Sequence, residues 1–258
     1  ISIIYNGEIY NYKNLKKNYF KSTKFNSNGD GEILIHLYNK FGINFISKIK
    51  GMFSICIIDQ NINKIYLIRD RFGIKPLYYF HDKNKNDLYF ASEINSILKN
   101  TNIKRELNYN ETFKFFKQGL VNGTNETFFK NIFQVNKSCY LEFSKNKIIE
   151  KQYYFLEKSI DEEKDKENIS FKKYVKDFKE NLLISFDEHN QFDVDCGVHL
   201  SGGVDSAILA ALCNCRKKKY LSYTFAFEDN KYSELESAKK ISSSTNILNK
   251  FSILKNEK

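Results

Sequence analysis

The sequence lacks any C-x-x-C pair, although it contains five cysteines. An odd number of cysteines without that spacing makes a disulfide framework or a zinc site improbable. Two of them lie only two residues apart, and residues so spaced on a helix do not face each other. Reduced thiols in a cytoplasm fit this pattern best. The five are Cys56, Cys139, Cys196, Cys213 and Cys215.

No uninterrupted apolar run is long enough to cross a bilayer, and no signal peptide is recognisable. Long basic blocks are also missing, although 41 Lys and Arg against 31 Asp and Glu give a formal net charge of +10. We interpret this excess as a Lys- and Asn-rich compositional bias, and a nucleic-acid binder is an alternative that the net charge alone suggests. Neither a membrane nor a nucleic acid is therefore expected as a partner.

Glycine is scarce, with eleven residues, yet Gly202 and Gly203 are adjacent. They lie in HLSGGVDSAILAAL (199–212), between an apolar stretch and a run of good helix formers. The following LSYTFAF (221–227) has the pattern of a strand. The order strand, loop, helix and strand predicts the start of a parallel sheet with crossover helices.

A glycine-rich loop that opens a helix can bind an anion through its backbone N–H groups and the positive end of the helix dipole. Ser201 and Ser206 would add hydroxyl donors, and Asp205 could cap the helix or help to hold a magnesium ion. A tight turn with an ordinary N-cap is an alternative of equal weight for these residues alone. Because the loop lacks the lysine of a Walker A motif, we favour a whole pyrophosphate as leaving group and adenylation of a carboxylate.

The first part of the chain predicts hairpins and one helix. Residues 52–59 and 64–70 flank a turn-rich segment, as do residues 76–80 and 88–92. Residues 31–42 carry apolar side chains on one helical face and end at a glycine. A further pair of strands is expected before residue 155.

A change in composition follows. Residues 156–170 are charged, a composition that indicates a linker. We therefore expect one domain over 1–155 and the beginning of another over 171–258. Ser170 could cap a helix in which apolar residues recur at helical spacing up to Phe186.

At this point the chain resembles a known family. LSGGVDSA is similar to the pyrophosphate loop of the N-type ATP pyrophosphatases, and its context is similar to glutamine-dependent asparagine synthetases. Several upstream segments resemble, in order, the class II glutamine amidotransferase domain of those enzymes: NGEIYNYKNL, GDGEILIHLY, GMFSICIIDQ, YLIRDRFGIKPLYY and FASEINSIL. The resemblance implies an α+β domain, an Ntn-hydrolase-like αββα sandwich of antiparallel sheets. The start of an α/β parallel-sheet domain of the adenine nucleotide α-hydrolase type would follow it.

The resemblance also implies a glutamine site. Asn6 and the Gly7 N–H would form the oxyanion hole, and Asn6, Glu8 and Asp30 would bind glutamine, Glu8 and Asp30 through its ammonium group. Locally, Asn6-Gly7 is a turn signal and Asp30 is a candidate N-cap of the helix near Gly31, alternatives that stay open here. Arg69 and Asp70 are expected to pair structurally.

In the second part, the resemblance implies ATP and Mg²⁺, with Asp205 as a candidate magnesium ligand. Phe225 would lie near the adenine, and a core aromatic is the equal alternative. Glu234 and Glu236 resemble an acidic helix start. The expected ATP and pyrophosphate-binding residues are Leu200, Ser201, Gly202, Gly203, Asp205, Ser206 and Phe225.

The family's nucleophilic cysteine and glutamine-binding arginine are not found in the sequence, and its second ATP motif would lie beyond Lys258. We therefore expect an inactive fragment, cut at both ends, of a cytoplasmic ligase that makes asparagine from glutamine, aspartate and ATP, as a homodimer. Three alternatives remain: a β-lactam-synthetase-like enzyme, an amidotransferase that adenylates another carboxylate, and a non-catalytic homologue.

Overall fold

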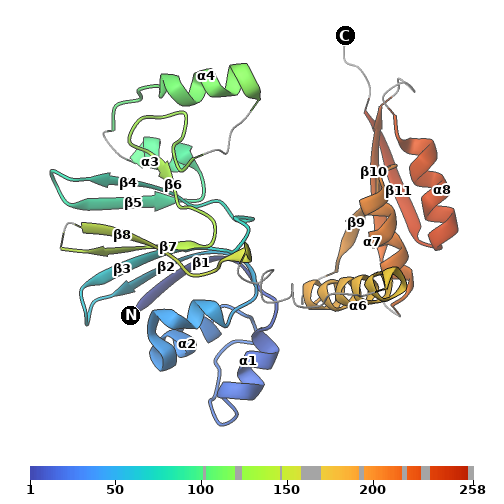
Figure 1. The fold of residues 1–258 in the computed structure, drawn as a ribbon, viewed down its shortest axis with the longest axis horizontal. Helices are drawn as coiled ribbons and strands as arrows, with labels where there is room; N and C mark the ends of the chain where they lie inside the picture. Colours follow the sequence, from blue (N-terminus) through green and yellow to red (C-terminus); the bar gives the residue numbers. More distant parts are fainter. Residues whose placement is uncertain are drawn as a thin grey trace. The chain divides into compact units, whose positions relative to one another are not determined.

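The computed structural model describes residues 1–100, 103–119, 124–145, 147–157, 170–191, 195–216, 220–227 and 233–254. The chain divides into two compact units, Ile1–Glu167 and Asn168–Lys258 (Figure 1). Each unit has a hydrophobic core of its own. Most of the charged segment predicted as a linker, residues 158–169, lies outside the described residues.

The first unit contains a five-stranded antiparallel sheet in the order β1-β2-β3-β7-β8, so β1 is an edge strand. The predicted hairpin at 52–70 is confirmed, as is the strand pair that ends before residue 155. The strands are β1 (Ser2–Ile9), β2 (Gly51–Asp59), β3 (Lys64–Arg69), β7 (Cys139–Ser144) and β8 (Lys147–Gln152).

A second antiparallel sheet, in the order β5-β4-β6, confirms the other predicted hairpin. Its strands are β4 (Tyr78–Asp82), β5 (Asp87–Ala91) and β6 (Phe133–Gln134). Apolar side chains of the two sheets form one cluster, so the sheets pack face to face. That cluster includes Cys56, Leu67, Leu77, Tyr79, Leu141 and Phe143.

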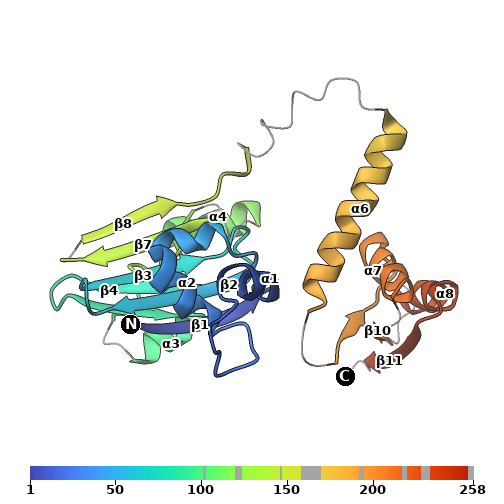
Figure 2. The ribbon, with the colours of Figure 1, turned by 90° about the horizontal axis from the view of Figure 1, so that it is seen from below.

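Helices cover the outer faces of this pair of sheets. The first helices, α1 (Tyr12–Tyr19) and α2 (Ile33–Phe41), lie across the five-stranded sheet (Figure 2), with the 3₁₀ helix η1 (Gly42–Ser47) after α2. On the smaller sheet, α3 (Ile94–Asn100) packs against β4 and β5. The result is four layers, helix, sheet, sheet and helix, which confirms antiparallel sheets in the first part of the chain.

The helix predicted over residues 31–42 forms as α2 and buries its apolar face. Ile33, Leu34 and Leu37 are fully buried. Gly42 ends the helix with a φ of 57°, a left-handed value that favours glycine, and its N–H donates to the Tyr38 carbonyl.

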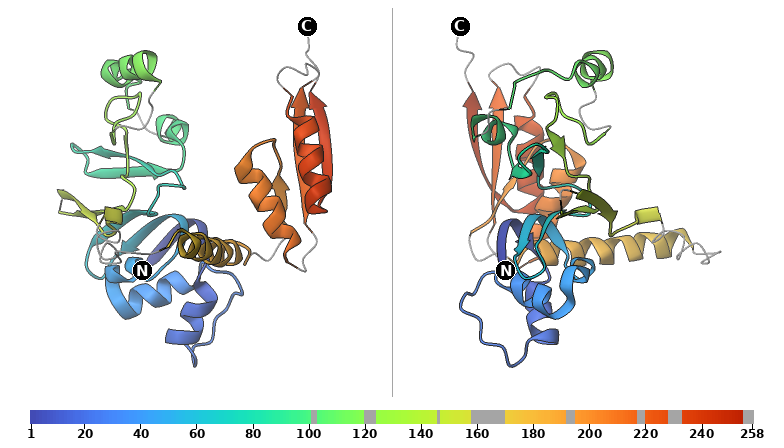
Figure 3. Two further views of the ribbon diagram at one scale, coloured as in Figure 1. Left: turned by 45° about the vertical axis from the view of Figure 1, so that its right-hand side comes forward. Right: turned by 90° about the vertical axis from the view of Figure 1, so that its left-hand side faces the viewer.

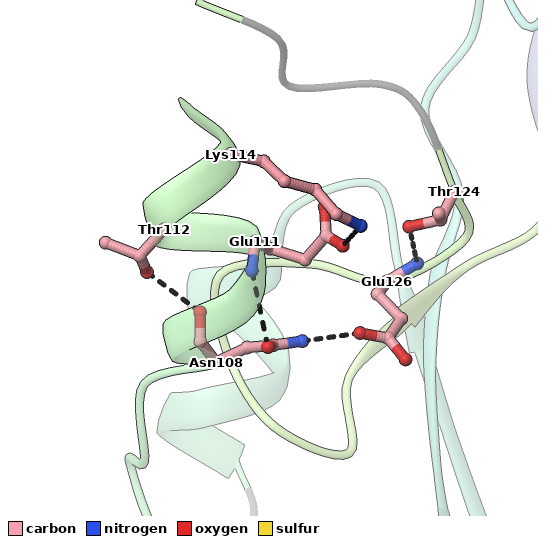
Figure 4. A network of polar contacts seen from close by, with 6 residues as sticks. All are labelled: Asn108, Glu111, Thr112, Lys114, Thr124 and Glu126. Carbon is pink, nitrogen blue, oxygen red and sulfur yellow. Dashed lines mark hydrogen bonds and ion pairs between the residues drawn. The ribbon is translucent and has the colours of Figure 1, made fainter. Parts of the chain in front are cut away.

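A polar network fixes the start of α4 (Tyr109–Gln118), as Figure 4 shows. The Asn108 side chain accepts from the Glu111 N–H at 3.5 Å and donates to Glu126 at 2.7 Å. The buried Glu111 carboxylate pairs with Lys114 at 2.5 Å. These bonds connect the helix to the segment at 124–126, where Thr124 accepts from the Glu126 N–H.

The second unit contains a parallel sheet in the order β11-β10-β9 (Figure 3). Its strands are β9 (Gly197–His199), β10 (Leu221–Phe227) and β11 (Leu248–Leu254). The helices α7 (Val204–Asn214) and α8 (Leu235–Thr245) connect them and contact each other. The predicted strand-loop-helix-strand order is therefore confirmed. One face of β10 is buried and carries Ser222, Thr224 and Ala226, while Tyr223, Phe225 and Phe227 are exposed.

The helix predicted after the linker forms as α6 (Phe171–His189), and the Ser170 side chain caps it by accepting from the Lys173 N–H. Of its apolar positions, Phe186 packs against the core of the second unit, whereas Phe171 and Phe178 are exposed. Among the described residues, no helix combines the length and the hydropathy that crossing a bilayer requires.

Candidate functional site

The open edge of β1 carries the first candidate site. The Tyr10 N–H donates to the Lys50 carbonyl, beside the start of β2, at 2.8 Å, whereas the Ile9 N–H donates away from β2 to Asp30 Oδ2 at 2.6 Å. Because N–H groups alternate in direction along an antiparallel strand, the Gly7 N–H has the same orientation as that of Ile9. The edge therefore presents the Gly7 N–H away from the sheet.

Gly7 lies in the middle of β1, so the interpretation of Asn6-Gly7 as a turn is wrong. A Cβ atom on Gly7 would lie 2.1 Å from the Met52 carbonyl oxygen and 2.7 Å from the Phe53 Cα. The position needs glycine because the backbone of β2 approaches too closely for a side chain.

The Asn6 side chain is held from the second sheet. Its Nδ2 donates to Ser92 Oγ at 3.2 Å, and Ser92 directly follows β5. An amide NH₂ has two hydrogens, so one remains for a ligand. Ser92 was missed as a site residue, although it lies within the segment FASEINSIL that carried the resemblance.

Asp30 contacts β1 rather than capping a helix, so the N-cap prediction is wrong. The helix α2 begins at Ile33, its N-cap is Glu32, and no side-chain cap bond forms. Asp30 Oδ2 accepts from the Tyr5 O–H and from the Ile9 N–H, both at 2.6 Å. Burial, followed by the bond to Asp30, raises the pKa of Tyr5. Nothing in the sequence patterns singled out Tyr5, because it is an ordinary position on the apolar face of β1.

Glu8 shares the exposed face of β1 with Asn6. Burial and then the neighbouring Glu8 carboxylate raise the pKa of Tyr10 to about 12. Asn6, Gly7, Glu8 and Asp30 are thus brought to one end of the open strand edge, Asp30 through its bond to Ile9.

The loop that carries Asp30 is fixed by Glu32. Its two carboxylate oxygens accept from the backbone N–H groups of Asn26 at 2.8 Å and Ser27 at 2.6 Å. These hydrogen bonds, with that of Asn26 the strongest influence, lower the pKa of Glu32 to about 2. A negative carboxylate at Glu32 therefore holds the loop over residues 26–32.

Arg69 and Asp70 have a structural role, because their side chains form hydrogen bonds with backbone groups. The Arg69 guanidinium donates to three carbonyls at 2.8–2.9 Å, those of Gly73, Lys75 and Val135. The buried Asp70 carboxylate accepts from four backbone N–H groups, those of Phe53, Phe72, Ile74 and Lys75. Both residues stabilise the loop after β3, and these hydrogen bonds assign neither residue to a substrate.

The two cysteines of the first unit are buried within its sheets. Cys56 pairs with Ile4 in the register of β1 and β2, and burial raises its pKa to about 12. Cys139 lies on β7, and burial raises its pKa to about 11. A thiol with a raised pKa is a poor nucleophile, so neither is a candidate for attack on a substrate amide.

The second candidate site is the loop between β9 and α7. It folds on itself: the Gly203 N–H donates to Ser201 Oγ at 3.2 Å, the Ser201 N–H donates to Ser206 Oγ at 3.2 Å, and Ser206 Oγ donates to the Gly203 carbonyl at 3.0 Å. Gly203 is the N-cap of α7, without a side-chain cap bond. The N-cap prediction for Asp205 is therefore wrong, and Asp205 lies exposed in the first turn. Leu200 is fully buried and can contribute only its backbone.

The two adjacent glycines serve different purposes. A Cβ on Gly202 would lie 2.9 Å from the Ser237 Cβ, so Gly202 allows α8 to approach the loop. A Cβ on Gly203 would meet only Ser201 Oγ, at 3.4 Å, so Gly203 leaves the outer side of the loop open. The Gly202 N–H donates to Glu234 Oε2 at 3.4 Å, which brings a carboxylate to the loop.

Phe225 is 59% exposed, so the interpretation as a core aromatic is wrong. Its ring stacks on that of His199, with centroids 5.7 Å apart and planes 25° apart. Both lie on the uncovered face of the parallel sheet, and His199 ends the strand that leads into the loop. His199 was missed, although it directly precedes the LSGG segment.

Two family models match the chain. One, described as a glutamine amidotransferase domain, matches residues 1–154. The other, described as asparagine synthase, matches residues 177–257. Between them they include both candidate sites.

The chain is 36% identical over 243 residues to asparagine synthetase (glutamine-hydrolyzing) 2 of Bacillus subtilis, covering 90% of this chain and 32% of that protein. It is 32% identical over 242 residues to a putative asparagine synthetase (glutamine-hydrolyzing) 2 of Methanocaldococcus jannaschii, covering 91% of this chain and 44% of that protein. Amidase chry2 of Gibberella zeae is 31% identical over 212 residues, covering 82% of this chain and 30% of that protein. The chain thus spans less than half the length of these relatives.

Proposed function

The chain belongs to the family of glutamine amidotransferase domains, and from this premise we propose that its first unit takes ammonia from the side-chain amide of glutamine. The second unit, we propose, binds ATP and activates a carboxylate that the ammonia attacks. A protein that contains both units would make asparagine from aspartate, as the names of its relatives suggest. We extend the proposal to a cytoplasmic homodimer of an Ntn-hydrolase-like domain and an adenine nucleotide α-hydrolase-like domain.

The open edge of β1 carries this proposal. Attack on an amide creates a negative oxygen, which needs donors fixed in advance. The Gly7 N–H points away from the sheet, and the neighbouring Asn6 amide is held by Ser92 with one hydrogen still available. Together they supply the two donors of an oxyanion hole. The attacking thiol is assigned to none of the five cysteines in residues 1–258.

Two carboxylates near this edge suit the other end of glutamine. Asp30 has one oxygen engaged by Tyr5 and Ile9, and among the described residues its Oδ1 has no hydrogen-bond partner. Glu8 is exposed on the same stretch of strand. Carboxylates pair well with the α-ammonium group of an amino acid, and we assign Asp30 and Glu8 to that group.

The loop at 201–206 supports ATP cleavage at the α-phosphate. It offers small residues, hydroxyls and N–H groups but no lysine to grip a γ-phosphate. Such groups can enclose a departing pyrophosphate while the α-phosphate stays open to a carboxylate. The exposed Phe225 would contact the adenine.

Magnesium suits the carboxylates beside this loop. No group of three or more His, Cys, Asp or Glu side chains that could hold a metal occurs among the described residues. Mg²⁺ commonly binds through one or two carboxylates together with substrate phosphates, so Asp205 would hold it with the pyrophosphate. The ion would supply positive charge to the leaving group. Glu234, which accepts from Gly202, would have to release that N–H to the phosphate.

The products of ATP test the proposal. A longer protein that includes this chain is supplied with glutamine, aspartate and ATP labelled with ³²P at the α or the γ position. The expected products are AMP, pyrophosphate and asparagine in equal amounts. ADP as the stoichiometric product would contradict adenylation and, with it, the function assigned to the second unit.

A second function differs only in the carboxylate that is activated. The similarity to amidase chry2, at 31% identity over 82% of this chain, supports it, because that relative has a different name from the synthetases. The same ATP assay with a panel of carboxylic acids distinguishes the two. Formation of AMP with another acid but not with aspartate would favour this alternative.

A further inference from the structure

We propose that Tyr5 is a positioning residue for glutamine, whose phenol fixes Asp30 in the orientation that accepts the substrate's α-ammonium group. The inference rests on the proposed glutamine site and adds a residue to it. Tyr5 would not touch the reacting amide, and its effect would pass through Asp30 alone.

The Asp30 carboxylate is held at one oxygen by two short bonds. Oδ2 accepts from the Tyr5 O–H and the Ile9 N–H, each at 2.6 Å. Two donors on one oxygen restrain the rotation of the carboxylate and leave Oδ1 for a third donor. The backbone donor belongs to the strand itself, so Tyr5 is the only side chain among the described residues that orients this group.

The Tyr5 ring also supports the loop that carries Asp30. A Cβ on Gly31 would lie 3.4 Å from Tyr5 Cδ1 and 3.7 Å from Cε1, so the backbone after Asp30 passes close over the ring. The Tyr5 side chain also packs against the core between the sheet and α1 and α2. Tyr5 is thus fixed by the core and in turn fixes the loop.

The phenol remains a donor under ordinary conditions. Burial and the adjacent Asp30 charge raise the pKa of Tyr5, so its proton is kept near neutral pH. A phenylalanine at this position would keep the ring under Gly31 and remove only the hydrogen bond. Tyr5→Phe therefore separates support of the loop from orientation of the carboxylate.

A second tyrosine provides a matched control. The Tyr38 O–H donates to Asp59 Oδ2 at 2.8 Å, and both residues are buried in the same unit. Asp59 is the last residue of β2 and follows Ile58, which pairs with Ser2 at the start of β1, seven residues along that strand from Ile9. Tyr38→Phe loses the same kind of bond away from the proposed site.

The experiment compares two ligands on the whole chain by ligand-observed NMR titration: L-glutamine and 4-carbamoylbutanoate, which is glutamine without its α-amino group. The ratio of the two dissociation constants measures recognition of the ammonium group. We expect Tyr5→Phe to lower the preference for glutamine about tenfold and Asp30→Asn to lower it by roughly 10- to 100-fold, in the range of hydrogen bonds to charged groups. Tyr38→Phe should leave the ratio unchanged.

The double variant tests whether Tyr5 acts through Asp30. In the Asp30→Asn background, Tyr5→Phe should have no further effect on the ratio. Loss of folded protein would weaken both ligands together and leave the ratio intact, so misfolding cannot imitate the expected result. An unchanged ratio in Tyr5→Phe, while Asp30→Asn still lowers it, would overturn the role of Tyr5 and keep the glutamine site. No preference for glutamine in the unsubstituted chain would overturn the proposed site itself.

Discussion

The two candidate sites are assembled over very different lengths of chain. Asn6 is held by Ser92, 86 residues later, and Asp30 is held by Tyr5, 25 residues earlier. In the second unit, the bonds among Ser201, Gly203 and Ser206 span at most five residues. The first site therefore depends on the packing of two sheets and a loop, whereas the second depends mainly on a local turn between a strand and a helix.

The donors also differ in kind. The first site combines a side-chain amide with one N–H on the open edge of an antiparallel sheet. The second, as proposed, would use consecutive N–H groups at a helix start, after a parallel strand, where anions commonly bind. An edge site can be lost through a change in distant packing, while a loop site is lost mainly through a change in the loop itself. The predictions below test this difference.

The largest effect is expected in the loop. In a longer protein that includes this chain, Gly203→Val would put a branched side chain on the open side of the loop, and Asp205→Ala would remove the proposed magnesium ligand. Both should abolish ATP-dependent synthesis and leave glutamine hydrolysis at least partly intact. Asparagine formation and glutamate release are measured side by side. The control Val204→Ala alters an exposed side chain of the same turn and should keep both activities. Equal loss of both activities in the Gly203→Val variant would contradict the separation of the two sites.

Asn6→Ala should lower glutamine hydrolysis in the same protein by roughly two to three orders of magnitude, the usual effect of removing one oxyanion donor. Synthesis from added ammonia should persist, because the loop at 201–206 is unchanged. Glutamate release and ammonia-dependent asparagine formation are the two readouts. Asn100→Ala, which removes an exposed amide bonded to the Ser96 carbonyl, is the matched control. If ammonia-dependent synthesis fell as far as hydrolysis, Asn6 would serve the fold rather than the reaction.

Protein stability should distinguish Gly7 from Gly203. Gly7→Ala brings a Cβ to 2.1 Å from the Met52 carbonyl oxygen, so we expect a loss of about 2–4 kcal/mol in the free energy of unfolding of the first unit. Gly203→Ala meets only Ser201 Oγ at 3.4 Å and should change that of the second unit by no more than about 0.5 kcal/mol. Urea unfolding followed by circular dichroism and tyrosine fluorescence measures both. Similar losses in the two variants would remove the contrast between a closely packed strand and an open loop.

The smallest effect concerns acid. The Glu32 pKa is lowered from 4.5 to about 2 by the N–H groups of Asn26 and Ser27. A depressed pKa contributes stability above the unfolded value, and that stability is lost as the pH falls from about 4.5 towards 2. Melting temperatures between pH 6 and pH 2 should therefore decrease less steeply for Glu32→Gln than for the unsubstituted chain. Parallel curves would show that this carboxylate does not hold the loop.

Local patterns predicted most of the elements correctly. The hairpins β2–β3 and β4–β5, the helix α2 with its stop at Gly42, and the order β9, α7, β10 all follow from periodicities and turn signals within short windows. The loop at 201–206 was also found from the sequence, because its two glycines and two serines lie within six residues. The different roles of Gly202 and Gly203 were not predicted, because they depend on the position of α8.

The wrong predictions share a physical cause. Asn6-Gly7 was open to interpretation as a turn, Asp30 as an N-cap and Phe225 as a core aromatic, each a fair inference from its immediate neighbours. Residues tens of positions away decide which strand pairs with β1, in which direction a loop carboxylate turns, and which face of a sheet stays uncovered.

By itself, the sequence determined the hairpins, the amphipathic helix and the glycine-rich loop, because these depend on side chains a few residues apart. Only the tertiary structure decided that β1 is an edge strand, that the Gly7 N–H faces outward, and that Tyr5 and Ile9 share one oxygen of Asp30. Hydrogen bonds between distant segments form only once the sheets and helices have packed, and no local pattern encodes which donor a carboxylate will then meet.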